Sequence, residues 1–285
     1  MNSAADPRSQ SRLRIAAIRF LNPAPLMWDF EHAPLDRELA RRYQIDRMMP
    51  SECADRLASG QADIGLIPIA SLAANPTLKI LPGCTIASKK RVRSLLLVHR
   101  ASQPLTALRA VAADTASRTT LAYARILLHR AGNPAVPFIP ASADLDAMLE
   151  IADAAILIGD PALLALEEQA NRFERTGERL VYLDLAEEWT RSMHVPFVSA
   201  VWGIACSGPF DEGIANDFIL SRIHGLDNID ALVAEWSKKL PVPEQTIRTY
   251  LTTNIHYVLD EDCIEGMRVF FREAGRLGLL PEYSF

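Results

Sequence analysis

Short apolar runs alternate with segments of helical periodicity along most of the chain. This alternation is typical of an α/β protein, in which helices separate the strands and cover the sheet. Strands are expected at 15–20, 62–68, 78–81, 94–98, 111–113, 154–158, 181–183 and 196–205, and a further strand ends at 48–50. Helices are expected at 35–43, 52–59 and 145–150, in segments that end near 131 and 173, and at 211–224, 227–239, 243–251 and 260–278.

Capping and turn residues refine these boundaries. Ser51 is expected to cap the helix at 52–59, and Gly60 suits the position after its end. Pro82 and Gly83 are expected to close the strand at 78–81, because both residue types favour turns.

The order of the elements predicts two α/β lobes. The segment after 211 contributes no strand, so its helices must pack on a sheet that is built earlier. We expect lobe 1 to comprise residues 12–100 and 204–285, and lobe 2 to comprise residues 101–203. The chain would cross near 98–105 and return near 199–207, and the C-terminal helices would cover lobe 1. Residues 1–11 are polar and are expected to form a disordered lead-in.

Composition narrows the classes of function. The 285 residues are 49% hydrophobic and carry a formal net charge of −5, which argues against a nucleic-acid partner. No signal peptide and no apolar run of membrane-spanning length is present, so we expect a cytoplasmic protein without a membrane partner. The four cysteines are widely scattered, and the histidines lack metal-ligand spacing, so reduced thiols and no metal site are expected.

Polar residues gather at the ends of predicted strands, where open α/β sheets bind ligands. Asn22 follows the first strand, and an Asx turn before Pro23 is the structural alternative. Ser117, Arg118 and Thr119 begin a long helix. Free N–H groups, hydroxyls and a guanidinium at a helix start can bind an anion, although a cap and a solvent-exposed arginine would also explain them.

Two more strand-end groups complete the candidate site. Ser88 and Ser94 flank a basic run before an apolar strand, and the alternative is a solvated loop with a strand-edge hydroxyl. Asp160 follows the strand at 154–158, where it would otherwise cap the next helix with Pro161 in the first turn. The chain lacks a GxSxG elbow, a Walker loop and a GxGxxG turn. These are the common sequence signatures of hydrolases, nucleotide-binding proteins and dinucleotide-binding proteins, so the sequence does not favour these classes.

These motifs together resemble a menaquinone-biosynthesis family related to type II periplasmic binding proteins. The resemblance extends over nearly the whole chain from about residue 12. It is carried by RIAAIRFLNPAPLMW, LASGQADIGLIPIASL, ILPGCTIAS, DTASRTTLAYARILL, DAAILIGDPAL, LDLAEEWTRSMHVPFVSAVW and YLTTNIHYVLDEDCIEGMRVFFREAGRLGLLP. It implies two lobes around a ligand cleft, with a helical C-terminal region.

The resemblance also implies a reaction. A lyase of this family removes water from chorismate to give 3-[(1-carboxyvinyl)oxy]benzoate, and no cofactor is expected. By position, Asn22 and Ser94 match active-site residues of the family, and the 117–119 cluster matches its anion site. Lys90-Arg91 and Met193-His194 depart from the family pattern, which leaves the detailed cleft shape open.

The expected substrate is a small dianion, which the enzyme must bind and orient. Asn22 would position the leaving hydroxyl or a carboxylate, while Ser94, Ser88, Asp160 and the 117–119 cluster would contribute to binding. A carboxylate of the substrate would serve as the base. The alternatives are a synthase of 1,4-dihydroxy-6-naphthoate, a non-catalytic solute-binding protein for small anions, and a ligand-sensing domain. Either a monomer or a homodimer is compatible with the chain.

Overall fold

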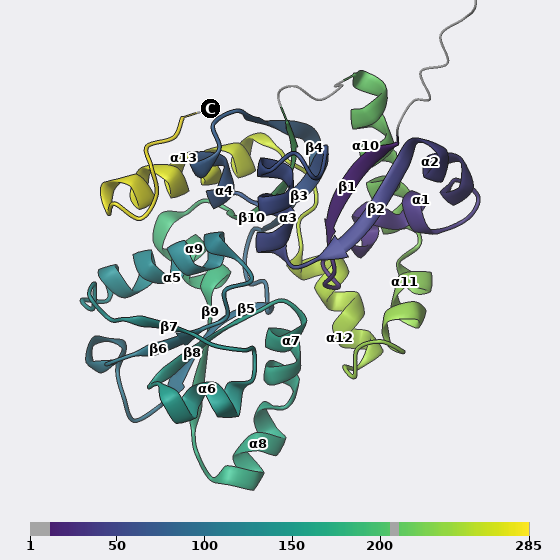
Figure 1. The fold of residues 1–285 in the computed structure, drawn as a ribbon. Helices are drawn as coiled ribbons and strands as arrows, with labels where there is room; N and C mark the ends of the chain where they lie inside the picture. Colours follow the sequence, from purple (N-terminus) through teal and green to yellow (C-terminus); the bar gives the residue numbers. More distant parts are fainter. Residues whose placement is uncertain (1–11, 206–210, 285) are drawn as a thin grey trace, which may run out of the picture.

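The computed structural model describes residues 12–205 and 211–284. It confirms an α/β fold with two mixed five-stranded sheets, each in its own lobe (Figure 1). The expected disordered lead-in at 1–11 lies outside the described residues, as does Cys206. The other three cysteines are buried and unpaired, as expected.

The first sheet has the order β2-β1-β3-β10-β4. Strand β1 is parallel to its neighbours β2 and β3, while β10 is antiparallel to β3 and β4. The chain therefore returns from the second lobe to place its last strand between two early ones. The strands are β1 (Leu13–Ile18), β2 (Tyr43–Met48), β3 (Ile64–Pro68), β4 (Leu78–Ser88) and β10 (Phe197–Ala205).

The second sheet has the order β7-β6-β8-β5-β9. Strand β6 is parallel to β7 and β8, and β5 is antiparallel to β8 and β9. All of its strands come from one continuous stretch of chain. They are β5 (Leu95–Arg100), β6 (Val111–Ala113), β7 (Phe138–Pro140), β8 (Ala154–Ile158) and β9 (Leu180–Asp184).

Strand pairing places the lobe boundaries earlier than the sequence suggested at both crossings. The expected first boundary follows Arg100, yet β5 pairs only with strands of the second sheet. The expected second boundary precedes Ile204, yet all of β10 lies in the first sheet. The segments that link the sheets are therefore 89–94 and 185–196. Both strands are mostly apolar, and such a run does not reveal which sheet it joins.

Helices cover both sheets, and the C-terminal ones do more than cover the first lobe. Helix α10 packs on β4, but α13 packs on both β10 and α5 of the second lobe. The helices are α1 (Trp28–Glu31), α2 (Asp36–Arg42), α3 (Pro50–Ala58), α4 (Ala70–Ala74), α5 (Arg118–Arg130), α6 (Leu145–Ile151), α7 (Asp160–Glu167), α8 (Gln169–Thr176), α9 (Leu185–Met193), α10 (Glu212–Asp227), α11 (Ile229–Trp236), α12 (Glu244–Thr249) and α13 (Glu261–Arg276). Shorter segments are 3-10 turns at Ala24–Met27 and Leu105–Ala107 and a π-helical turn, η3, at Tyr250–Asn254.

Two local expectations were wrong. Helix α3 begins at Pro50, so Ser51 lies inside the helix and Met49 is the capping position, with Glu52 bonded to its backbone N–H. Strand β4 continues through Pro82 and Gly83 instead of ending there. The strand tolerates proline because it lies at the edge of the sheet. Its register with β10 also shifts between Ile80 and Thr85, so Pro82 and Gly83 lie in a β-bulge.

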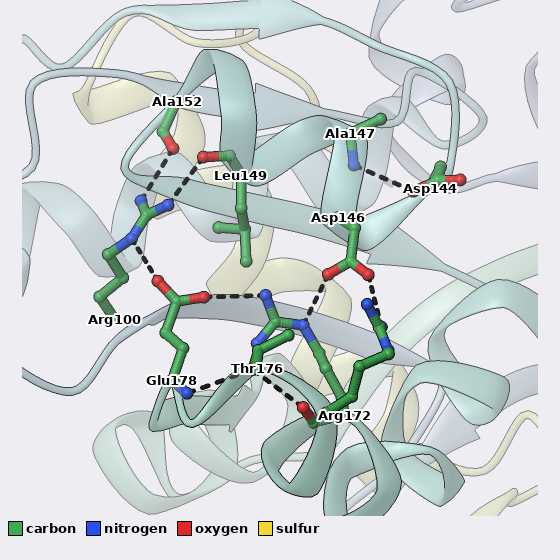
Figure 2. A network of polar contacts seen from close by, with 10 residues as sticks. Arg100, Asp144, Asp146, Ala147, Leu149, Ala152, Arg172, Thr176 and Glu178 are labelled. Atoms are coloured by element: carbon green, nitrogen blue, oxygen red, sulfur yellow. Dashed lines mark hydrogen bonds and ion pairs between the residues drawn. The ribbon is translucent and has the colours of Figure 1, made fainter.

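The far end of the second lobe is held by charged side chains (Figure 2). Arg172 donates to Asp146 at 2.7 Å and to Glu178 at 2.8 Å, and Arg100 also bonds Glu178. This network joins β5, α6 and α8 and lies away from the first lobe. Within the described ranges, no helix combines the length and the apolar character needed to cross a membrane.

Candidate functional site at the interlobe junction

The carboxyl ends of parallel strands bring polar residues to one edge of each sheet. In the first sheet, Asn22 follows β1 and Ser71 follows its parallel neighbour β3. In the second sheet, Asp114 follows β6 and Asp160 follows its parallel neighbour β8. Such an edge is where open α/β sheets bind ligands.

These two edges contact one another directly, and we call their contact region the interlobe junction. The backbone N–H of Leu21 donates to Asp160 Oδ1 at 2.9 Å, and that of Ala70 donates to Thr119 Oγ1 at 3.0 Å. Gly159 packs on the ring of Phe20, where a Cβ would lie only 2.5 Å from a ring carbon. Gly159 also has a φ of 73°, so glycine is required there for two reasons.

Three side chains meet at one end of the junction. The Tyr250 hydroxyl donates to Ser94 Oγ at 2.8 Å, and both residues are buried. Burial raises the pKa of Tyr250 strongly, and its hydrogen bonds with the Ser94 and Asn22 side chains act in the opposite direction. The backbone also joins this group to Asp160, because the Gly159 N–H donates to the Ser94 carbonyl at 2.7 Å.

Asp160 has an unusual ionisation equilibrium. Burial raises its pKa to about 6, although the Leu21 N–H and the positive charge of Arg19 act to lower it. Burial also raises the pKa of Asp114, on the neighbouring strand end. A carboxyl group tuned toward neutrality beside a ligand site can exchange a proton with the ligand.

Several buried polar atoms at the junction have no partner among the described residues. Buried polar atoms are nearly always hydrogen-bonded in a protein, so such a group indicates that a ligand or water completes it. The atoms are Asn22 Oδ1, Ser71 Oγ, Asp114 Oδ2 and Thr120 Oγ1.

The structure brings some of the expected site residues together and engages others elsewhere. Asn22, Ser94 and Asp160 lie in one group. Ser117 caps α5 by accepting from the Thr120 N–H at 3.3 Å, and Thr119 lies at the junction, where it accepts from the Ala70 N–H.

The remaining two expected residues are held by contacts within the protein. Arg118 is largely exposed and donates to Asp55 at 2.6 Å, so a carboxylate already occupies its guanidinium in this conformation. Ser88 donates to the Arg91 carbonyl at 3.1 Å and thus closes its own turn.

Sequence reasoning missed Tyr250 and Asp114. Tyr250 lies in a segment predicted to be helical, where a tyrosine next to a leucine is expected to be part of the core. The π-helical turn that begins at Tyr250 is the structural signal, because such turns are frequent at functional sites. Asp114 directly follows a predicted strand, so the strand-end argument that selected Asn22 could also have selected Asp114.

Other possible sites lie away from the junction. A cavity of about 680 Å³ lies beside β2 and α3, and one of about 280 Å³ lies between α5 and α9. His256, Asp260 and Cys263 have ligand atoms within 4.8 Å of one another. The Lys89 ammonium group donates to Asp260 at 2.8 Å, so a positively charged side chain already contacts the carboxylate of that cluster.

The fold defines the class of protein. Two mixed sheets joined by two crossings are the architecture of type II periplasmic binding proteins, which the chain resembles in structure. A sequence-family model described as "Menaquinone biosynthesis" matches residues 13–276, so the chain belongs to that family.

Individual relatives agree with this assignment. The chain is 28% identical over 265 residues to a chorismate dehydratase of Thermus thermophilus, covering 90% of this chain and 93% of the relative. A crystal structure of protein AF1704 from Archaeoglobus fulgidus superposes with a TM-score of 0.71 at 14% identity, covering 94% of this chain and 98% of that one. The periplasmic aliphatic sulphonate binding protein SsuA of Escherichia coli superposes with a TM-score of 0.62 at 16% identity, covering 94% and 86% of the two chains. At such identities the structural matches establish the fold alone.

Proposed function

We propose that this protein is a chorismate dehydratase, a carbon–oxygen lyase that converts chorismate to 3-[(1-carboxyvinyl)oxy]benzoate. Membership of the menaquinone biosynthesis family and the Thermus thermophilus relative support this reaction. The observation that carries the proposal is the pairing of two unsatisfied groups at the junction. Asn22 Oδ1 is an acceptor without a donor, and the Ser94 hydroxyl receives a bond but makes no other one with the described residues.

This pairing suits a hydroxy acid better than a simple anion. The free proton of Ser94 can bind a carboxylate oxygen, and the free oxygen of Asn22 can accept from a hydroxyl group. Chorismate offers both, because it has two carboxylates and a ring hydroxyl. A sulfonate offers acceptors only and would leave Asn22 Oδ1 without a donor.

The reaction removes the ring hydroxyl and a hydrogen from a neighbouring ring carbon, and the ring becomes aromatic. In our proposal Asn22 orients the leaving hydroxyl, while Asp160, with its pKa raised to about 6, supplies a proton to it. A carboxylate of the substrate takes the ring proton. The protein contributes orientation and exclusion of water, consistent with the direct contact of the lobes around the site.

The test is incubation of the purified protein with chorismate, followed by mass spectrometry of the product. Loss of one water and appearance of an aromatic absorbance would support the dehydratase. Tight binding without turnover would identify a binding protein instead, and turnover of a later pathway intermediate to 1,4-dihydroxy-6-naphthoate would identify the synthase.

A further inference from the structure

The Ser94 hydroxyl has only one proton to donate. In the structure it accepts a bond from the Tyr250 hydroxyl at 2.8 Å. A serine hydroxyl that accepts at one lone pair still has its own proton free. Because the other described residues take no bond from this hydroxyl, the proton is available to a ligand.

Tyr250 is well placed to maintain this arrangement. Its side chain is fully buried, and it lies at the start of the π-helical turn η3. This turn follows α12, whose Thr246 bonds Glu167 at the end of α7 in the second lobe. Tyr250 is therefore anchored to both lobes near the point where the first crossing enters β5.

The electrostatic surroundings keep the tyrosine protonated. Burial, together with the negative charges of Asp160 and Asp184, disfavours the phenolate and raises the pKa of Tyr250. A neutral phenol has one proton and directs it to Ser94. Tyr250 thus acts as a fixed donor throughout the physiological range of pH.

We propose that Tyr250 is a positioning residue, whose hydroxyl bond to Ser94 directs the serine proton toward a carboxylate oxygen of the substrate. Tyr250 acts through Ser94 and does not itself contact the reacting atoms. This role rests on the proposed function of the same site, since it presupposes a carboxylate-bearing substrate at the junction.

The test is a double-mutant cycle with Tyr250→Phe and Ser94→Ala, measured as kcat/KM for chorismate. The matched control is Tyr123→Phe, because Tyr123 is also buried and, among the described residues, its hydroxyl bonds only the backbone of Val198. We expect Tyr250→Phe to lower kcat/KM about tenfold, mainly through a higher KM, as one lost buried hydrogen bond predicts. We expect the same substitution in the Ser94→Ala background to change kcat/KM less than about twofold.

Three outcomes separate the proposals. If the wild-type protein neither binds nor converts chorismate in calorimetry and turnover assays, the proposed function fails. If the wild type is active and Tyr250→Phe behaves like Tyr123→Phe, the positioning role is wrong. Full additivity of the Tyr250 and Ser94 effects would also overturn it, because two independent residues do not couple.

Discussion

Asn22 and Asp160 perform different tasks at the same junction. Asn22 lies just beyond β1 and offers an unsatisfied amide oxygen, whereas Asp160 accepts a backbone N–H from the neighbouring Leu21. Asn22 can therefore bind a ligand. Asp160 is an ionisable group within the contact between the lobes, so its protonation affects that contact. Substitutions at the two positions should be separable by activity and by pH.

At Asn22 we predict that charge matters more than shape. Asn22→Ala should lower turnover of chorismate about tenfold, because an orienting group is lost. Asn22→Asp should lower it about 100-fold, because it places a negative charge beside a dianion. Steady-state assays would measure both changes, with the exposed Asn171→Ala as the control. Full turnover by Asn22→Ala would show that Asn22 has no part in the reaction.

At Asp160 we predict a specific dependence of stability on pH. Between the ordinary pKa of 3.8 and about 6, the folded protein retains a proton that the unfolded chain has released. Protonation thus stabilises the fold at low pH, and this contribution is lost as the pH rises through 6. Asp160→Asn mimics the protonated group, so its advantage over the wild type should grow from pH 4 to 7, up to about 3 kcal/mol.

Denaturant unfolding of both proteins across that range of pH would measure the advantage of Asp160→Asn. Several other carboxyl groups also have shifted pKa values. Because both proteins contain these groups, their contributions to the pH dependence of stability cancel in the comparison. A difference that does not change with pH would show that Asp160 titrates normally.

At the scale of elements, the crossings depend on a single buried carboxylate. Asp184 ends β9 and caps α9 by accepting from the N–H groups of Ala186 and Glu187. It also accepts from the N–H groups of Val92 and Arg93 in the first crossing, at 2.9 and 2.6 Å. The two connections between the lobes are therefore held together at one residue.

Replacing this carboxylate should destabilise the protein more than the loss of a helix cap alone. Asp184→Ala leaves several buried N–H groups without an acceptor, and we expect it to lower the free energy of unfolding by about 3 kcal/mol. Asp144→Ala is the matched control, because Asp144 caps α6 through one exposed bond and should cost about 1 kcal/mol. Equal effects in thermal or denaturant unfolding would contradict the crossing role.

The elements themselves were largely predictable from the sequence, and their partners were not. The strand at Val111–Ala113 was predicted with its observed bounds, because polar residues follow a short apolar run. Strand β4 was cut short at Pro82, since the sequence does not show that the strand lies at an edge. In the site, Asn22, Ser94 and Asp160 could be predicted, because polar residues at strand ends mark the edge where an α/β sheet binds ligands. Tyr250 depends on how a distant helix packs, which local pattern cannot reveal.

At the scale of the whole molecule, the two sheets differ in how the chain assembles them. The second sheet is built from the continuous stretch between β5 and β9, whereas the first needs β10 to pair with both β3 and β4. Pairings between distant segments form late, because loop closure costs entropy before contacts repay it. In pulsed hydrogen exchange during refolding, we expect amides of β6 and β8 to gain protection before those of β3 and β10. Simultaneous protection would contradict this order.

The position of β10 has a further consequence during synthesis on the ribosome. Until Phe197–Ala205 has left the exit tunnel, the facing edges of β3 and β4 have no partner, and the whole second lobe must be translated before β10. A nascent chain therefore exposes two apolar strand edges for the time needed to translate that lobe. Chaperones should bind this protein cotranslationally at β3 and β4 and release it once β10 has emerged.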